Sequence, residues 1–522
     1  MSNITKSIDK KDEVELSSFL QSESSLDNNN NNNNNNNITT ASGGSGFLPG
    51  PPWVINILAN ELCERFSYYG LRAILPLYFV SLGWSESASI SVFMFSSAGA
   101  YFCSVFGGFI ADSILGKYTT IMRFSLVYCF GMMLVAISAL FTSSIGCIIG
   151  LFFVSIGTGG IKPNVASFGA DQFPPSANTS AEDLTRFFMI FYFSINVGSV
   201  ASFIITPLAR KYCGYFVAFL IPSLLLTFAV YLFWKARHFY TRKPVQGSPL
   251  SRVYKVFQTA RRPELSQNRK QMVDMGKHWL EAALNENNDC DAVAISETVA
   301  LFRICKIFMC LPAYWMLYDQ AGAAWIIQAK HLNRYNIFEP EQVGVLNPVL
   351  VLIFIPLFDK CIFPFIENKL QYKLTSVKKM VGGMILCIMA FIMSCIIQSM
   401  IENAEAAGDD NKISIIMQLP QIIILTLSEI LVSTTGLDFA YQNSPSSMKS
   451  IIMALFLLTT AVGDFFGGIF YLVLGNVLSG TFMYIVFSIL MIINTIIFIS
   501  TSKRFVPYQK LKEEYGSGSE PL

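Results

Sequence analysis

The feature that most constrains this chain is a succession of twelve apolar runs, each near or above the roughly 20 residues that a helix needs to cross a bilayer. The runs lie at 54–81, 88–111, 119–141, 145–166, 186–209, 215–235, 300–328, 343–366, 377–401, 414–439, 449–474 and 480–501. A chain in lipid finds backbone hydrogen-bond partners only within its own helices, so each run is expected to be helical. The sequence therefore predicts an all-α membrane protein with twelve transmembrane helices.

The amino-acid composition excludes several classes of function. Of 522 residues, 52% are hydrophobic and 14% are charged, whereas a soluble domain carries roughly a quarter charged residues. The net charge of +2 gives no case for a nucleic-acid partner. The three histidines, His238, His278 and His331, all lie outside the apolar runs. We therefore expect no metal, no cofactor and no enzyme activity, because a membrane-embedded acyltransferase or protease would need a nucleophile–base or metal constellation in its spans.

The order of the runs predicts the domain organisation. We expect a disordered cytoplasmic N-terminus with an Asn tract at 1–52, a six-helix bundle at 53–235, a cytoplasmic linker at 236–299, a second six-helix bundle at 300–502 and a cytoplasmic tail at 503–522. The orientation follows from Lys and Arg in the linker, in the short loop before the ninth run and in the tail. Two six-helix bundles suggest a transporter with its site between them near the midplane.

The first run carries a stripe of polar side chains. On a helix that turns about 100° per residue, the following residues fall on one side: Glu61, Glu64, Arg65, Tyr68, Tyr69 and Arg72. A charge at a helix centre costs roughly 2.5–3.5 kcal/mol on insertion scales, so this stripe is expected to face a polar cavity rather than lipid. Two carboxylates one turn apart suit proton coupling. The alternative is a structural ion-pair cluster that only holds the helices together.

Other charges lie deep in later runs. Lys162 follows a glycine-rich stretch of the fourth run, and we expect it to form an ion pair with the acids of the first run. The alternative is a lysine whose side chain extends to the membrane edge. Glu429 lies in the tenth run without a local cation, which suits an incoming ammonium group, or else is a protonated, neutral acid. Arg303 and Asp359 are expected at similar depth and suggest a latch at the cytoplasmic end.

Three motifs resemble one family. The string Glu61–Gly70 matches ExxERFxYYG in every fixed position, and the stretches Gly157–Phe173 and Phe191–Ser199 resemble two further signatures. Gly108–Lys117 resembles the loop between the second and third spans found across the major facilitator superfamily. Over most of residues 53–502, the chain resembles the proton-coupled oligopeptide transporter family of that superfamily.

The resemblance implies roles for individual residues. The residues that match its proton-coupling motif are Glu61, Glu64 and Arg65, with Lys162 as their salt-bridge partner. Those that match substrate-binding positions are Arg72 and Lys162 for the carboxylate, Asn196 and Glu429 for the amine, and Tyr68, Tyr69, Tyr192 and Trp315 for the cavity wall. Arg303 and Asp359 match a gate pair.

The resemblance also implies a function: symport of protons with di- and tripeptides by alternating access. We expect a monomer in the lipid bilayer, in the plasma membrane or an endolysosomal one. Met94 stands where animal relatives have a histidine, so the first-run acids must carry coupling alone. The loop between the ninth and tenth runs is short, so a large extracellular domain is missing. The alternative is a carrier of nitrate, free histidine or another small solute. A receptor with the same fold that binds its ligand without transporting it is a further alternative.

Overall fold

A computed structural model describes most of the chain. The described residues are 50–173, 181–245, 250–262, 265–274, 278–283, 292–335, 337–369, 371, 374–408, 413–445, 448–503, 505–506 and 508. Within these ranges the regular elements are helices, and Asn333 and Ser414 make an isolated bridge. The all-α prediction is confirmed. The expectations for the Asn tract and for most of the tail lie outside the described residues.

The N-terminal bundle is built from long helices joined by tight turns. Its elements are α2 (Val54–Ser81), α3 (Glu86–Ile110) with the π turn η1 (Ala111–Leu115), α4 (Lys117–Leu140), α5 (Ser144–Ile161), α6 (Val165–Ala170) and α7 (Ala181–Lys235). Although α7 is continuous in its hydrogen bonding, Gly214 has φ 82°, a value that L side chains rarely adopt. This residue therefore divides α7 into two antiparallel spans.

The C-terminal bundle contains more broken helices. Its elements are α10 (Ala292–Phe308), α11 (Leu311–Tyr318), η4 (Asp319–Gly322), α12 (Ala324–Lys330), η5 (Pro340–Val345), α13 (Leu346–Leu357), η6 (Phe358–Ile362), η7 (Phe365–Lys369), α14 (Ser376–Ala406), η8 (Ile415–Gln418), α15 (Leu419–Glu429), η9 (Ile430–Thr434), α16 (Thr435–Gln442), α17 (Lys449–Leu474) and α18 (Gly480–Ser502). Irregular backbone within a membrane is tolerated where it is buried in protein or lines a cavity. The breaks at Asp319 and Glu429 therefore mark candidate functional positions.

The predicted number of spans is confirmed by the fold. Nine stretches of the described residues are long and apolar enough to cross a membrane, and one of them is the bent α7, which contains two spans. Two further spans fail that criterion for clear reasons. Helix α2 carries four charged residues in its middle, and the span from α10 to α12 is interrupted at residues 309–310 and at η4.

Large apolar side chains cover the outside of both bundles. Ile145, Phe152, Phe482 and Ile496 are each more than half exposed on helices that would face lipid. Soluble monomers rarely expose contiguous apolar patches larger than a few hundred Å². This surface is that of a multi-pass membrane protein.

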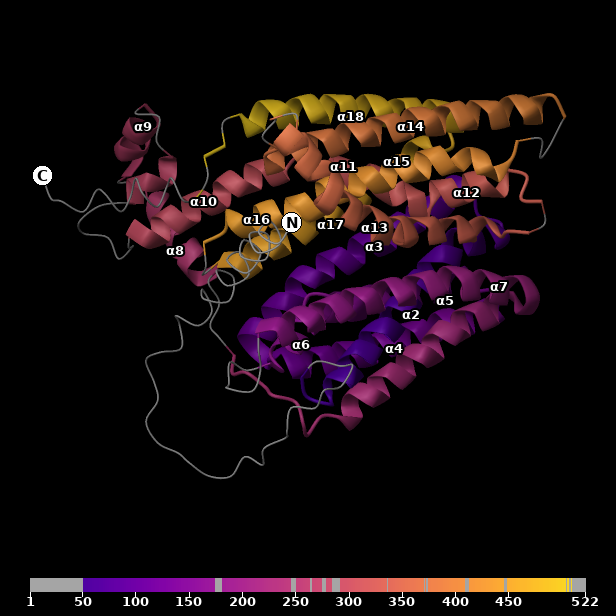
Figure 1. The fold of residues 1–522 in the computed structure, drawn as a ribbon, viewed down its shortest axis with the longest axis horizontal. Coiled ribbons are helices and arrows are strands. Elements are labelled where there is room, and N and C mark those ends of the chain that lie inside the picture. The colour runs from indigo at the N-terminus through magenta and orange to yellow at the C-terminus, as the bar shows by residue number, and fades with distance from the viewer. Residues whose placement is uncertain are drawn as a thin grey trace, which may run out of the picture.

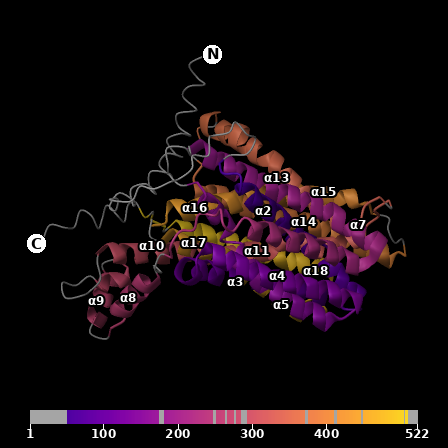
Figure 2. The ribbon, with the colours of Figure 1, turned by 90° about the horizontal axis from the view of Figure 1, so that it is seen from below.

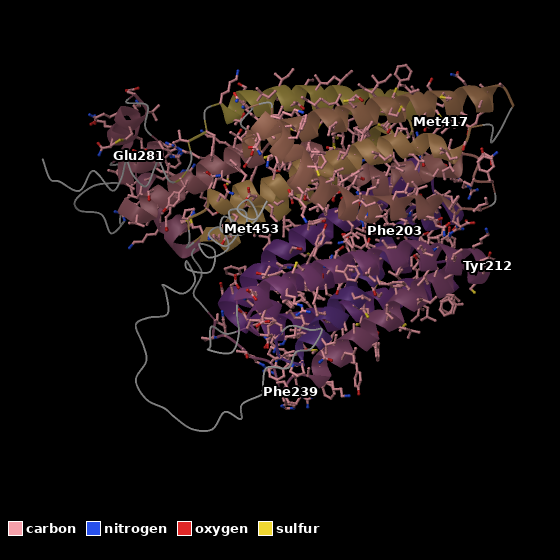
Figure 3. The ribbon with its side chains drawn as sticks, viewed as in Figure 1. Phe203, Tyr212, Phe239, Glu281, Met417 and Met453 are labelled. Carbon is pink, nitrogen blue, oxygen red and sulfur yellow. The ribbon has the colours of Figure 1, made fainter. Side chains whose placement is uncertain are left out.

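The two bundles lie side by side, from indigo to magenta and from orange to yellow (Figure 1). The bend of α7 and helix α12 lie at one end, which we call the outer end because the predicted orientation places it outside the cell. The linker helices α8 (Leu250–Ala260) and α9 (Ser266–Asp274) lie beyond the opposite, inner end, beside α10 (Figures 1 and 2). Tyr212 and Glu281 mark these two ends in Figure 3.

Glycines allow α3 and α5 to approach closely in the N-terminal bundle. A Cβ atom added to Gly159 would lie 2.3 Å from Cys103 Cβ, and one added to Gly107 would lie 2.4 Å from the carbonyl oxygen of Gly159. Small residues are the usual means of bringing membrane helices together, because lipid supplies no hydrophobic driving force between them. This contact fixes the C-terminal end of α5, which Lys162 caps, against α3.

Candidate functional site

The acids of α2 are paired with Arg65 inside the N-terminal bundle. Arg65 Nε lies 2.8 Å from Glu61 Oε1 and also 2.8 Å from Glu64 Oε2. Only the contact with Glu61 has hydrogen-bond geometry, and neither oxygen of Glu64 accepts a hydrogen bond. All three residues are at most 6% exposed. One guanidinium therefore balances two acids, and Glu64 is incompletely satisfied in this conformation.

Lys162 lies above aromatic rings rather than in an ion pair. Its Nζ atom is 3.6 Å from the ring centroid of Tyr101 and 4.8 Å from that of Tyr68. Cation–π contacts of this kind stabilise a desolvated ammonium group. Among the described residues, no acid lies within ion-pair distance of Lys162, so the predicted pair with the α2 acids is not formed here. Glu64 is nevertheless near enough to interact with Lys162 electrostatically.

Arg72 links the two bundles. Its Nη1 atom donates to Tyr68 Oη at 2.7 Å and to Ser97 Oγ at 3.0 Å. Its Nη2 atom donates to Asp319 Oδ1 at 3.2 Å, across 247 residues of sequence. Because Asp319 lies at the break between α11 and α12, the ion pair joins the N-terminal bundle to an irregular part of the C-terminal one. The Arg72 and Asp319 side chains are 14% and 12% exposed.

Glu429 lies at the end of α15, where that helix passes into the π turn η9. Asn347 Nδ2 donates to Glu429 Oε2 at 2.7 Å, and Tyr318 lies next to the same carboxylate. Across the bundle interface, Tyr69 and Tyr192 lie close enough to interact with it electrostatically. Among the described residues, no cation forms an ion pair with Glu429.

The remaining residues that the sequence predicts to bind the substrate are arranged differently. Trp315 is buried, packs edge-on against Tyr318 and Phe456, and its Nε1 atom has no hydrogen-bond partner among the described residues. Tyr192 is 40% exposed. Asn196 donates to the carbonyl oxygen of Tyr192 one turn before it, so its amide does not reach across the interface here.

The predicted gate pair is not closed. Arg303 and Asp359 form no ion pair, and Asp359 is exposed on η6 beyond α13, a span of which few residues are buried. Arg303 instead lies near His278 of the linker. Burial, with Lys306 and Arg303 nearby, lowers the pKa of His278 to about 4. A latch between Arg303 and Asp359 in another conformation stays a prediction.

The outer end, in contrast, is tied together by charge. Arg210 Nε lies 2.6 Å from Glu341 Oε1, whose side chain is fully buried. Lys330 Nζ and His331 Nε2 lie 2.9 and 3.0 Å from Glu86 Oε1. Among the described residues, the ion pairs that connect the two bundles thus lie at the outer end or near the midplane. These ion pairs hold the two bundles together at the outer end.

Several site residues were missed by reasoning from the sequence. They are Ser97, Tyr101, Asp319, Asn347 and Asp464. Asp319 and Asp464 are acids in the middle of apolar runs. The cost of burying a charge in a membrane helix, which singled out the α2 stripe, therefore also applies to both of them. The polar uncharged residues gave no comparable signal, because hydroxyl and amide groups are common in membrane helices.

Two six-helix bundles that enclose fixed charges of both signs at their interface define a membrane transporter of the major facilitator type. Residues 118–479 match the model of the POT family, and residues 19–181 match that of the Major Facilitator Superfamily. The chain belongs to the POT family.

Known proteins extend the comparison. Human solute carrier family 15 member 2 is 37% identical over 398 residues, covering 73% of this chain and 53% of that protein. Human member 1 is 34% identical over 380 residues, covering 68% and 52%. The chain spans about half the length of the curated relatives it matches.

Solved structures agree over nearly their whole length. The POT family transporter PepTSo superposes with a TM-score of 0.75 at 29% identity, covering 88% of this chain and 99% of that one. An auto-inhibited POT family peptide transporter gives 0.76 at 28% identity, covering 90% and 99%. The major facilitator fold is thereby confirmed.

Proposed function

We propose that the protein is a proton-coupled symporter of di- and tripeptides that works by alternating access. The observation that carries the proposal is the placement of opposite charges on the two bundles. Arg72 and Lys162 belong to the N-terminal bundle, and Glu429, on the C-terminal bundle, interacts electrostatically with Tyr69 of α2 across the interface. A zwitterionic peptide presents a carboxylate and an ammonium group several ångströms apart, and this site offers each a partner of opposite charge.

Recognition through the peptide termini leaves the side chains free to vary. Tyr68, Tyr69, Tyr192 and Trp315 supply the aromatic wall, which binds apolar and polar side chains through area rather than specific hydrogen bonds. Asn196 reaches the amine after a change of rotamer. Broad side-chain specificity follows. A relative from Caenorhabditis elegans, Peptide transporter family 2, and the auto-inhibited structure are both named as peptide transporters, which supports peptides as the substrate class.

Coupling to protons is assigned to Glu61 and Glu64. Arg65 lies in contact with both acids, so protonation of one acid weakens the electrostatic attraction that keeps Arg65 in place. Lys162 or Arg65 then turns to the peptide carboxylate, and the bundles rock. Ion pairs join the bundles at the outer end here while Arg303 and Asp359 are apart, which is the arrangement expected of a carrier that opens inward.

A flux assay in liposomes tests the proposal. Purified protein should accumulate a labelled dipeptide when the outside is acidic, and should only exchange it when no pH gradient is imposed. With the potential clamped at zero, one proton per peptide supports about tenfold accumulation for each pH unit. Accumulation of nitrate or free histidine, without competition by dipeptide, would instead favour the small-solute alternative. Binding without flux would indicate a receptor.

We further propose that the protein is a monomer in the plasma membrane, with the termini and the linker 236–299 in the cytoplasm. The excess of Lys and Arg near the inner end supports this orientation. Protease protection of tags placed at either terminus, in sealed right-side-out vesicles, would test it.

A further inference from the structure

A cavity of about 360 Å³ lies at the outer end and is lined by α3 of the N-terminal bundle and by α12, α14, α17 and α18 of the C-terminal one. Its volume falls within the roughly 300–1,000 Å³ of small-molecule sites. Three acids line it, Glu86 on α3 and Glu402 and Glu405 on α14. Among the described residues, the cations that contact these acids are Lys330 and His331. Negative charge is therefore in excess even when His331 is protonated.

Glu402 is the acid of this cavity that has no counter-ion among the described residues. Its Oε1 atom accepts a hydrogen bond from the backbone N–H of Thr481 at 2.9 Å, at the start of α18, and a long one from Gln398 Nε2 at 3.4 Å. Its Oε2 atom accepts none from the part of the chain that the structure describes. A carboxylate can accept about four hydrogen bonds, so Glu402 can still bind a charged donor.

Two buried tyrosines give a second, independent indication of a ligand. Tyr471 and Tyr484 line the cavity and are only 5% and 4% exposed. Neither hydroxyl group forms a hydrogen bond with a described residue, although a buried Tyr hydroxyl usually finds a partner. The Tyr484 hydroxyl is near enough to Glu86 and Glu402 to interact with both electrostatically, which places it on the cavity side.

Much of the remaining wall is apolar. The apolar side chains include those of Ile90, Ile327, Ile401 and Met483. An ammonium group on an aromatic or alkyl body would cover this surface and could also lie against the tyrosine rings. A zwitterionic peptide fits the cavity poorly, because its carboxylate would meet the three acids. The lining therefore favours an amine that carries no carboxylate.

We propose that this outer cavity binds a small organic cation, a primary amine with an aromatic or short alkyl body, at a site separate from that of the transported substrate. The ammonium group binds Glu402 and Tyr484, and the body packs on the apolar wall. Because both bundles line the cavity, a bound amine holds them together at the outer end and slows transport. This effect on transport rests on the proposed symport, whereas the binding does not.

Equilibrium dialysis of labelled 2-phenylethylamine against the full-length protein in detergent tests the binding. This amine is protonated at neutral pH, as a lysine side chain is. We expect saturable binding that neither dialanine nor the neutral 2-phenylethanol displaces. The absence of saturable binding would overturn the proposal. Displacement by dialanine would place the amine in the substrate site, and displacement by the alcohol would show that charge is not recognised; either result would also overturn it.

Substitutions in the cavity locate the bound amine. Glu402→Gln keeps an oxygen for the N–H of Thr481 but removes the charge, so the Kd should rise about tenfold or more. Tyr484→Phe removes a hydroxyl that has no described partner, so the fold should be kept while the Kd rises about 2- to 10-fold. The control is Asp438→Asn on α16, an exposed acid bonded to Gln442, which should keep the Kd of the wild type. An unchanged Kd in either cavity variant would contradict the proposed site.

Transport gives a separate measurement. In liposomes, 2-phenylethylamine should lower the maximal rate of dialanine exchange and leave its KM unchanged. Binding without any change in exchange would refute the effect on transport and leave the site in place. A wild type that does not exchange dialanine even without the amine would refute the proposed function, while the dialysis measurement would still decide whether the cavity binds the amine.

Discussion

At the scale of single residues, Glu61 and Glu64 have the same neighbour but different surroundings. Glu61 receives a hydrogen bond from Arg65, whereas Glu64 is 1% exposed and receives none. A buried acid without a donor is held in place by its charge alone, so its protonation changes the position of Arg65 most. Glu64 is therefore the better candidate for the α2 acid that takes up the transported proton.

Glu64→Gln and Glu61→Gln should abolish accumulation driven by a pH gradient while peptide exchange between equal concentrations continues. The amide keeps the size of the acid and removes the titration, so the roughly tenfold accumulation per pH unit is lost. The comparison is Glu182→Gln, an exposed acid in the first turn of α7. Accumulation at the normal rate in either α2 variant would contradict the coupling assignment for that acid.

Glu429→Gln should weaken the binding of peptides with a free amine by about 10- to 150-fold, the equivalent of the roughly 1.5–3 kcal/mol of a hydrogen bond to a charged group. In the variant, Asn347 can still donate its hydrogen bond to the amide oxygen of the substituted side chain, as it does to Glu429 in the wild type. Competition of uptake by free and N-acetylated dialanine measures the effect, and the acetylated peptide should compete equally well in both proteins. If the wild type itself binds the two peptides equally, Glu429 does not hold the amine.

At the scale of helices, the sequence was sufficient where a span is apolar and continuous. It predicted α14 and α18 within a few residues. It did not predict the division of the seventh span into α10, α11 and α12, because an apolar run looks the same whether its backbone is regular or broken. The break puts Asp319 at the end of a helix, from which it reaches Arg72.

Gly159→Ala should lower the stability of the protein. Its new methyl group would meet Cys103 Cβ at 2.3 Å at the crossing of α3 and α5, and overpacking of this kind costs about 1–3 kcal/mol. Thermal unfolding in detergent, followed by the fluorescence of a thiol-reactive dye, measures the change. Gly382→Ala on α14 is the control, since the nearest atom to its added Cβ is Leu431 Cδ1 at 3.9 Å. Equal loss in both variants would contradict the close-approach argument.

At the scale of the whole molecule, His331 makes closure of the outer end depend on pH. Its Nε2 atom lies 3.0 Å from Glu86 of the N-terminal bundle, and its Nδ1 atom lies 2.8 Å from Glu405. Both ring nitrogens face carboxylates, so the protonated ring fits best. The hydrogen bond to Glu86, opposed by burial and aided by Glu405, raises the pKa of His331 above 6.5.

The direction of the effect follows from that raised pKa. The contribution of His331 to closure is complete below its ordinary value and is lost as the pH rises through the raised one. Spin labels at the exposed positions Tyr212 and Ile337, one on each bundle, should report a larger open population at high pH. His331→Gln should remove this dependence. A wild-type distance distribution that does not change with pH would contradict the assignment.

The sequence by itself determined the membrane-spanning character, the number of spans and the polar stripe of α2, because hydropathy and the helical period are local properties that a chain carries wherever it folds. Only the tertiary structure decided which charges meet. Asp319 pairs with Arg72 across 247 residues, and Asp464 lies against Asp319 although neither shares a helix with the other. Such contacts depend on the tilt, breaks and packing of separate helices, which no periodicity within one of them specifies.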